Sequence, residues 1–366
     1  MTGGLPGPCS LADFEQSAAA VLPGPVWDFL AGGSGGERTL TANRAALDRI
    51  FVVPRVLRDV SGCSTAATML GKPVSMPVAV APVAYHRLFH PDGELASARA
   101  AKAARVPFTV STLSSVPLEE VAAVGGAVWF QLYWLRDKQA VFELVARAED
   151  AGCEALMLTV DVPWMGRRLR DVRNEFTLPA DVQPANLAPR AGSAAGRRVS
   201  GGSALSAHTS QAFSASVTWA DLTELRARTP LPLIVKGVLA AQDAVRAAEC
   251  GADAVVVSNH GGRQLDAVAP AIDMLGNVCA EVAGRCEVVV DSGIRSGTDV
   301  LKALALGATG VLLGRPLIWG LAAAGEAGAL QVIELLRTEI RDALGLAGCV
   351  SPGAASHLGT VREPGS

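Results

Sequence analysis

The feature of this sequence that most limits its fold is a series of short apolar runs that alternate with segments of helical spacing. From residue 77 onward the runs are Pro77–Ala81, Pro107–Ser111, Val128–Leu132, Ala155–Val160, Leu233–Val235, Ala254–Val257, Glu287–Asp291 and Gly310–Leu313. They are rich in Val, Leu and Ile with little alternation, which is typical of strands buried on both faces of a parallel sheet. Helical spacing between them is clearest in Glu94–Ala104, Lys138–Ala151, Ala241–Cys250 and Asp299–Leu306.

Eight strand-like runs, each followed by a helix, predict an α/β fold of the (β/α)8 TIM-barrel type. Gly152, Gly251 and Gly307 each separate a helical segment from an apolar run, where glycine supplies a left-handed helix end. The roughly 290 residues from the first run to the end of the chain suit this barrel. A doubly wound sheet would need a GxGxxG fingerprint after its first strand, and residues 81–84 (Ala-Pro-Val-Ala) lack it.

We expect one domain over residues 1–366, with 1–76 as an N-terminal helical segment and 77–350 as the barrel. The N-terminal helices are expected at Leu11–Leu22, Val26–Ala31 and Leu40–Ala46. After the fourth strand, a flexible loop is predicted at 180–216, because its middle is rich in Ala, Gly and Ser. We interpret it as a mobile, partly disordered flap over the site; a spacer without function is the alternative.

Composition excludes several classes of protein. Half of the 366 residues are apolar, 18% are charged and the net charge is −3, unlike a disordered chain or a basic nucleic-acid-binding protein. No apolar stretch reaches the ~18 uncharged residues of a membrane span, and Met1–Leu11 shows no secretory signal. The seven cysteines form no CxxC pair and the five histidines no HExxH motif, so we expect no metal. Scattered cysteines indicate a reducing compartment, and we expect a cytoplasmic protein.

Polar residues stand at nearly every predicted strand end. In a barrel of this type the catalytic groups project from the carboxyl ends of the strands, so we expect these residues to face one mouth. They are Ser111, Gln131, Tyr133, Thr159, Asp161, Lys236, the segment Ser258–Arg263, the segment Asp291–Arg295, and Gly314 with Arg315.

Several of these side chains suggest a particular chemistry. Lys236 ends a buried run, which suits a structural ion pair, a Schiff base or a countercharge to an anionic ring. His260 precedes two glycines and is a candidate general base, with Asp161 as the candidate that orients it. Arg168 and Arg263 are candidate carboxylate clamps, although a charge run such as that around Arg168 is also typical of a solvated face. The ends of strands seven and eight predict a phosphate site.

Taken together, these residues resemble the family of FMN-dependent 2-hydroxy-acid oxidases and dehydrogenases, which includes glycolate oxidase, lactate oxidase and mandelate dehydrogenase. The most specific match is the nine-residue segment from Ser258 to Asp266 (Ser-Asn-His-Gly-Gly-Arg-Gln-Leu-Asp). Further matches are Phe130–Tyr133, Leu158–Asp161, Val235–Gly237 and Gly314–Pro316, and the resemblance runs from about Leu11 to about Ser351. Within the family, 81–85 and 161–168 are most similar to members that act on 4-hydroxymandelate.

The resemblance implies FMN as the cofactor and assigns residues to it. The residues implied for the FMN ring are Pro82, Val83, Ala84, Ser111, Gln131, Thr159, Lys236 and Ser258, and those for its phosphate are Asp291, Ser292, Gly293, Arg295, Gly314 and Arg315. Substrate would be held by Tyr133, Arg168 and Arg263, with His260 as base, Asp161 as its partner and Lys236 stabilising negative charge on the flavin.

Two positions depart from the family pattern. Phe29 stands where relatives usually have a tyrosine that contacts the substrate carboxylate, so the site loses a hydroxyl and gains an apolar face. This favours an aromatic ring on the substrate over a small acid such as glycolate. Ser292 stands where relatives often have glycine, and here we expect only a small local effect.

The activity that the resemblance implies is oxidation of an aromatic (S)-2-hydroxy acid, 4-hydroxymandelate or mandelate, to 4-hydroxybenzoylformate or benzoylformate. O2 would be reduced to H2O2, and the resemblance also implies a homotetramer. Alternatives within flavin chemistry are a dehydrogenase with a quinone acceptor and an oxidative-decarboxylating monooxygenase. Alternatives outside it are a Schiff-base aldolase or lyase built on Lys236 and a non-catalytic barrel that binds a phosphorylated ligand.

Overall fold

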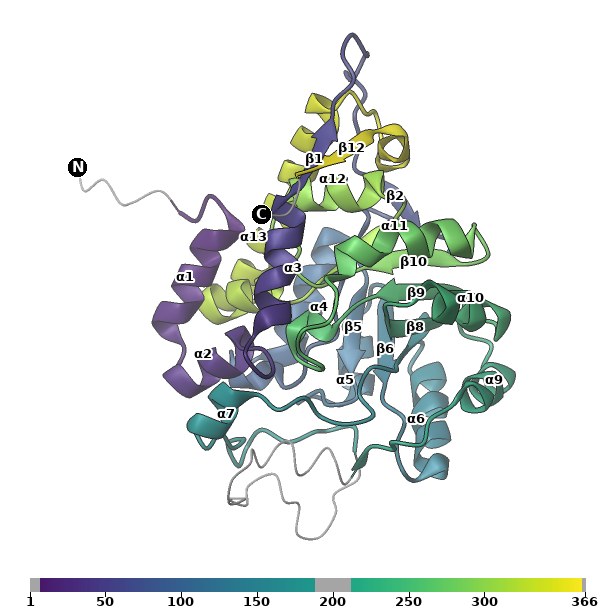
Figure 1. Cartoon of the computed structure of the whole chain (residues 1–366). Helices are drawn as coiled ribbons and strands as arrows, with labels where there is room; N and C mark the ends of the chain where they lie inside the picture. Colours follow the sequence, from purple (N-terminus) through teal and green to yellow (C-terminus); the bar gives the residue numbers. More distant parts are fainter. Residues whose placement is uncertain (1–6, 188–211, 364–366) are drawn as a thin grey trace, which may run out of the picture.

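Eight parallel strands close into a barrel in the part of the chain that this computed structural model describes, residues 7–187 and 212–363 (Figure 1). The strands are β4 (Val78–Val80), β5 (Phe108–Ser111), β6 (Val128–Leu132), β7 (Ala155–Thr159), β8 (Leu233–Val238), β9 (Ala254–Val257), β10 (Glu287–Val290) and β11 (Gly310–Leu313). Neighbours along the chain pair with one another, and β11 pairs with β4 to close the ring. The predicted (β/α)8 TIM barrel is confirmed.

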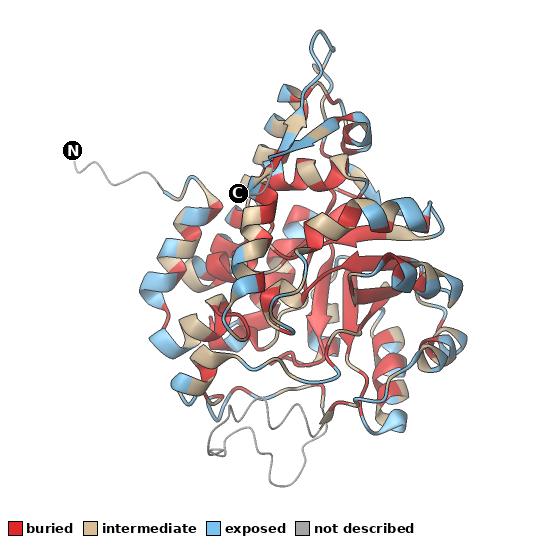
Figure 2. Cartoon of the chain, in the orientation of Figure 1, coloured by how far each residue is buried: buried red, intermediate tan, exposed pale blue. Residues whose placement is uncertain are grey.

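Helices surround this barrel and bury one face each against it. They are α4 (Gly93–Ala104), α5 (Leu118–Ala123), α6 (Lys138–Asp150), α9 (Trp219–Arg228), α10 (Ala241–Glu249), α11 (Ala271–Val282), α12 (Gly297–Ala305) and α13 (Arg315–Leu346). Figure 2 shows buried strands inside and exposed outer helix faces. The fully buried strands explain why their sequences are continuously apolar rather than alternating.

The three predicted N-terminal helices are present as α1 (Leu11–Val21), α2 (Gly24–Ala31) and α3 (Arg38–Asp48). A capping box between Ser10 and Asp13 begins α1, which packs against α13. The other two helices reach the barrel mouth: α2 contacts the short helix α7 (Leu169–Arg173), and α3 contacts the 3-10 turn η3 (His260–Gly262). The N-terminal segment therefore supplies one wall of the mouth.

Two small sheets outside the barrel were not predicted from the sequence. Strand β1 (Ile50–Val53) pairs antiparallel with β12 (Gly359–Arg362), close to the C-terminus. Strands β2 (Ala67–Met69) and β3 (Lys72–Val74) form a hairpin through Leu70 and Gly71, both with positive φ. Two positive φ values in a two-residue loop are typical of the turn that matches strand twist. Two further 3-10 turns are η1 (His86–Leu88) and η4 (Pro352–His357).

The predicted flexible loop at 180–216 lies only partly within the described residues. Val182 and Phe213 are buried, and Phe213 forms an antiparallel bridge with Leu135. Residues 188–211 lie outside the described residues, so the predicted mobility stays a prediction. What is described shows that the far end of the loop returns to the barrel mouth.

One helix of the described chain, α13, is long and apolar enough to cross a membrane by those two criteria alone. The most apolar window of α13 is 61% buried inside the molecule, where the helix packs against α4, α1 and α12. Burial on this scale is what a core helix of a folded protein shows.

Candidate active site

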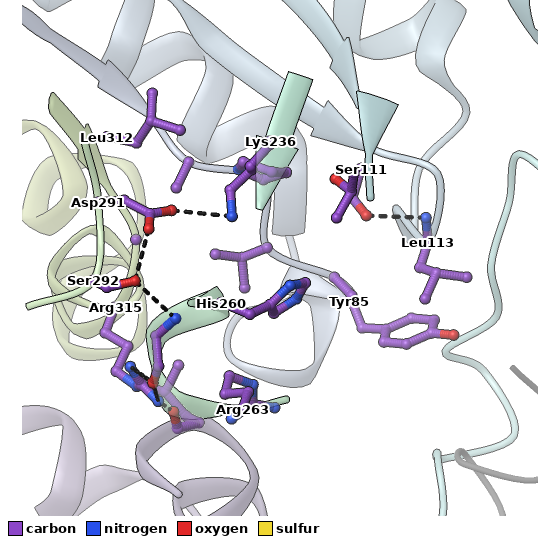
Figure 3. A pocket seen from close by; sticks show the side chains of 18 of the residues that line it. Tyr85, Ser111, Leu113, Lys236, His260, Arg263, Asp291, Ser292, Leu312 and Arg315 are labelled. Carbon is purple, nitrogen blue, oxygen red and sulfur yellow. Dashed lines mark hydrogen bonds and ion pairs between the residues drawn. The ribbon is translucent and has the colours of Figure 1, made fainter. Parts of the chain in front are cut away.

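A pocket lies at the carboxyl end of the barrel, where the strand ends meet α2 and η3 (Figure 3). Of the residues predicted from the sequence, its lining contains Phe29, Pro82, Val83, Ala84, Ser111, Tyr133, Thr159, Arg168, Lys236, His260, Arg263, Asp291, Ser292, Gly293, Arg295, Gly314 and Arg315. Gln131, Asp161 and Ser258 are absent from this lining. Each of the three is instead hydrogen-bonded to a lining residue and lies one layer behind it.

His260 and Asp161 form a hydrogen-bonded pair from two different strand ends. The Nδ1 atom of His260 lies 2.9 Å from Oδ1 of Asp161, which leaves Nε2 as the free ring nitrogen. His260 has a left-handed backbone (φ 59°) in η3, where Asn259 accepts a hydrogen bond from the Gly262 N–H. Gly237 permits the approach of the carboxylate, because a Cβ there would lie 2.6 Å from Cγ of Asp161.

Burial and charge set the protonation of this pair. Burial lowers the pKa of His260 below its ordinary value, although Asp161 acts in the opposite direction. Burial alone would raise the pKa of Asp161, but His260 and Lys236 bring it below its ordinary value. The pair therefore consists of a neutral imidazole and an ionised carboxylate at neutral pH, the protonation state that a general base needs.

Lys236 is a buried ammonium held between two neighbours. Its Nζ lies 3.0 Å from Oδ2 of Asp291 and donates to the Ser258 hydroxyl at 3.0 Å. Burial would lower the pKa of Lys236, but Asp291 and Asp161 raise it above its ordinary value. An amine that stays protonated is a poor nucleophile, so this geometry favours the countercharge interpretation over a Schiff base.

Ser292, for which the sequence suggests a small local effect, takes part in three hydrogen bonds. Its backbone has a φ of 73°, a conformation that favours glycine. Its hydroxyl donates to Asp291 Oδ1 at 2.7 Å and accepts from the N–H groups of Gly261 (3.0 Å) and Asn259 (3.3 Å). This serine therefore connects the partner of Lys236 to the turn that carries His260.

Two arginines converge beside an aromatic wall at one side of the pocket. The guanidinium carbons of Arg168 and Arg263 lie 5.9 and 5.1 Å from the ring centroid of Phe29. That ring stacks in turn on Phe176 at 4.9 Å and on Phe89 at 6.5 Å. Two guanidiniums next to an apolar ring suit a ligand that joins a carboxylate to an aromatic group.

Neither of these arginines is fully neutralised. Arg263 Nη1 donates to the carbonyls of Phe29 (2.6 Å) and Gly32 (2.9 Å), and Arg263 has no ion pair among the described residues. Arg168 has only a distant carboxylate, with Nη1 4.0 Å from Oδ2 of Asp171. The pair thus carries two positive charges against one negative charge, which favours binding of a monoanion.

A second cluster of positive charge lies at the ends of β10 and β11. Burial lowers the pKa of Arg295 to about 9 and that of Arg315 to about 10. Neither has an ion pair with a carboxylate in the described chain; Arg295 stacks on the Trp319 ring at 4.8 Å. Arg315 donates to the carbonyls of Leu30 (2.9 Å), Gly32 (3.0 Å) and Gly261 (3.1 Å), so it also connects α2 to η3. Partly buried cations without carboxylate partners fit the predicted phosphate.

A third group of polar atoms near the pocket is suited to a flat heterocycle. Nε2 of Gln131 and Oγ1 of Thr159 are buried and have no hydrogen-bond partner among the described residues. They stand at the ends of adjacent strands, and Ser111 lies beside Gln131 on the next strand, 3.1 Å from its Oε1. A ring with carbonyl and N–H groups would satisfy them, so the residues present fit FMN.

Sequence reasoning missed several lining residues. The pocket also contains Leu30, Ala81, Tyr85, Phe89, Leu113, Met165, Phe213 and Leu312, in addition to Gly261 and Ile294 of the two predicted segments. The ring of Phe213 stacks on that of Tyr133, with ring centroids 4.4 Å apart. No sequence pattern near residue 213 predicts this contact. Two missed groups did carry a signal: Tyr85 follows the first strand closely, and Asp171 stands three residues after Arg168.

Comparison with known proteins gives a consistent result. Residues 18–358 match the family model described as FMN-dependent dehydrogenase. The chain is 61% identical over 351 residues to the 4-hydroxymandelate oxidase of Amycolatopsis orientalis, covering 96% of this chain and 98% of that protein. It is 46% identical over 347 residues to the L-lactate oxidase of a Nostoc species, covering 93% and 95%. A solved structure of mandelate oxidase with (S)-4-hydroxymandelic acid has a TM-score of 0.95 at 60% identity, covering 97% and 99%.

Proposed function

Since this chain belongs to the FMN-dependent dehydrogenase family and is an FMN-dependent 2-hydroxy-acid oxidase, we propose that it oxidises 4-hydroxymandelate or mandelate. The products are 4-hydroxybenzoylformate or benzoylformate, with O2 as the final electron acceptor and H2O2 as its product. The observation that carries this proposal is the pairing of two incompletely neutralised arginines with the Phe29 wall beside His260. A small acid such as lactate has no ring to pack against that wall.

The arginines hold and orient the substrate. Arg168 and Arg263 bind the carboxylate through their remaining N–H groups, and Tyr133 donates a hydrogen bond to a substrate oxygen. The hydroxyl of Tyr133 is suited to this, because burial raises its pKa and keeps it protonated. Fixing the acid at these points places its alcohol carbon next to His260.

His260 accepts the proton that leaves the substrate. Its Nε2 is the free base, since Nδ1 is engaged by Asp161, and the same carboxylate stabilises the imidazolium that forms. The substrate also loses two electrons, and FMN, when bound, supplies their acceptor. Lys236, kept charged by Asp291, lies where it stabilises negative charge on the cofactor side of the pocket.

The experiment that tests this function is anaerobic mixing of the purified holoenzyme with glycolate, lactate, mandelate and 4-hydroxymandelate. We expect the two aromatic acids to bleach the flavin fastest. In air, one H2O2 per O2 consumed supports the oxidase; O2 uptake with CO2 and little peroxide would identify a monooxygenase. Turnover only with a quinone would identify a dehydrogenase.

We also propose a cytoplasmic homotetramer, supported by the scattered free cysteines and by the likeness to the family. Light scattering of the purified holoenzyme measures its mass, and a monomeric mass would contradict the assembly.

A further inference from the structure

Tyr85 supplies a buried polar group that the proposed function does not use. Its side chain is 0% exposed and lines the pocket, and its hydroxyl has no hydrogen-bond partner among the described residues. Burying a hydroxyl in this way costs free energy, because its hydrogen bonds to water are lost and no hydrogen bond within the protein replaces them. Such a group calls for an explanation, and a ligand that completes its hydrogen bond is one.

The backbone of Tyr85 is also held in an unfavourable conformation. Its φ is 58° and its ψ 55°, the left-handed region that bulky side chains rarely adopt. Its N–H donates to the Leu113 carbonyl at 3.1 Å, which ties it to the loop after β5. Strain of this kind concentrates where a side chain must be aimed at a ligand.

The position of Tyr85 relative to the charged residues shows which part of a ligand it meets. Asp161, Arg168 and Arg263 affect the pKa of Tyr133, whereas burial and Tyr133 raise the pKa of Tyr85. Figure 3 shows the Tyr85 ring beyond His260, on the side away from Asp291 and Arg315.

Apolar side chains also line the pocket that contains Tyr85. Leu113, Phe89 and Phe29 line the same pocket, and Phe29 and Phe89 are stacked on each other. Burial raises the pKa of Tyr85, so its hydroxyl stays protonated and can donate as well as accept. A substrate ring in this region would bury any para-hydroxyl in an apolar setting unless Tyr85 paired with it.

We propose that Tyr85 is a specificity-determining residue that hydrogen-bonds the para-hydroxyl of the substrate ring, so that the enzyme prefers 4-hydroxymandelate to mandelate. This inference rests on the proposed function. With the carboxylate at Arg168 and Arg263 and the alcohol carbon at His260, the ring extends to the apolar side of the pocket. The para-hydroxyl and the Tyr85 hydroxyl then satisfy each other.

The test compares Tyr85→Phe with the unchanged holoenzyme on three substrates: 4-hydroxymandelate, mandelate and 4-methylmandelate. The methyl group matches the hydroxyl in size but forms no hydrogen bond. We expect the kcat/KM ratio of 4-hydroxymandelate to mandelate to fall at least about tenfold in Tyr85→Phe, because the para-hydroxyl is left buried without a partner. The preference for 4-hydroxymandelate over 4-methylmandelate falls with it.

Two further measurements separate specificity from structure. Tyr133→Phe removes the same atom from the other tyrosine, and we expect it to lower kcat/KM for all three substrates while the ratio stays the same. The melting temperature of Tyr85→Phe should match that of the parent enzyme, since the lost hydroxyl forms no hydrogen bond in the described chain.

The outcomes distinguish this inference from the function beneath it. Flavin reduction by all three substrates with an unchanged ratio in Tyr85→Phe would overturn the role of Tyr85 alone. An equal loss on every substrate would do the same, because it would indicate a structural role. If none of the three reduced the flavin of the parent enzyme, the proposed function would fail first.

Discussion

At the scale of single residues, the same environment lowers the pKa of His260 and raises the pKa of Lys236. Lys236 is buried and His260 is partly buried at neighbouring strand ends, and Asp161 affects the pKa of both. Burial prevails at His260, which stays neutral and able to accept a proton, whereas the carboxylates prevail at Lys236, which stays charged. Asp161 raises the pKa of both groups, but it outweighs burial only at Lys236, where Asp291 acts with it.

A pH prediction follows for Asp161→Asn. Asp161 raises the pKa of His260, so its removal lowers that pKa further and keeps the base neutral to a lower pH. We expect the acid limb of the kcat/KM profile to move to lower pH. We also expect kcat to fall at least about a hundredfold, because the imidazolium loses its counterion. An acid limb at the same pH as in the parent enzyme would show that Asp161 does not affect the pKa of the base.

Arg263→Lys tests the carboxylate clamp. Nη1 of Arg263 donates to the carbonyl of Phe29 in α2 and to that of Gly32 directly after α2. The other N–H groups of Arg263 remain available to bind the substrate. A lysine ammonium cannot make both sets of bonds, so we expect KM to rise and kcat to fall. Together they should raise the activation free energy that corresponds to kcat/KM by about 2 kcal/mol. The exposed Arg228→Lys on α9 is the control and should leave both constants unchanged. Unchanged kinetics in Arg263→Lys would remove this residue from the clamp.

Ser292 allows strain and hydrogen bonding to be separated. Ser292→Gly and Ser292→Ala both lose the hydroxyl that reaches Asp291, but only alanine keeps a Cβ at a φ of 73°. We expect the alanine variant to be less stable than the glycine variant by about 1–2 kcal/mol. Urea unfolding of both proteins measures the difference, and equal stabilities would show that this backbone is not strained.

At the scale of elements, the active site depends on a short helix that could not hold its own position. Helix α7 has five residues, too few for independent stability, and Arg168 stands at its N-terminus. Arg170 joins it to Glu37 (2.8 and 2.6 Å) and to Asp28 (3.2 Å). Through these contacts the N-terminal helices set the position of a substrate-binding arginine.

Arg170→Leu should therefore disturb substrate binding from outside the pocket. Because these ion pairs are partly exposed, we expect the binding free energy of the substrate to weaken by about 1 kcal/mol or less. The change should be seen as a several-fold rise in KM, with kcat little changed. FMN content, measured by absorbance, should stay the same. A KM equal to that of the parent enzyme would show that α7 is held by other contacts.

The elements also show how far sequence reasoning reaches. The barrel strands could be predicted because each is a continuous apolar run, and only their ends shifted: Leu233–Val235 extends to Val238 through the buried Lys236. Strands β1 and β12 could not be predicted. Each is short and half exposed, and its partner lies some 300 residues away along the chain, so neither carries a local signal.

At the scale of the whole molecule, strand ends that are distant in sequence meet at one mouth and bring four arginines together there. The Arg295 and Arg315 cluster lies at the ends of β10 and β11, and Arg168 and Arg263 lie beside Phe29. The topology of the barrel makes the predicted residues converge, so the polar strand ends could be found from the strand pattern, whereas Phe29 and residues 82–84 were found only through the family resemblance. Tyr85 and Asp171 lie near predicted site residues in the sequence, but the unpaired polar atoms that distinguish them are visible only after folding.

Removal of FMN should lower the stability of the whole barrel. A ligand that binds only the folded state adds about 2.7 kcal/mol at a concentration near 100 times its Kd. We expect FMN to raise the melting temperature of the apoprotein, and riboflavin, which lacks the phosphate, to raise it less. Equal shifts with both would contradict the assignment of Arg295 and Arg315 to the phosphate.

The most direct test of the central claim is anaerobic mixing of the FMN-loaded protein with 4-hydroxymandelate, with His260→Ala in parallel. The account predicts that the parent enzyme loses its yellow flavin absorbance, while His260→Ala retains FMN and stays yellow. Bleaching of His260→Ala at the parent rate would contradict the role of His260 as the base. A colourless protein that could not be reconstituted with FMN would contradict the account as a whole.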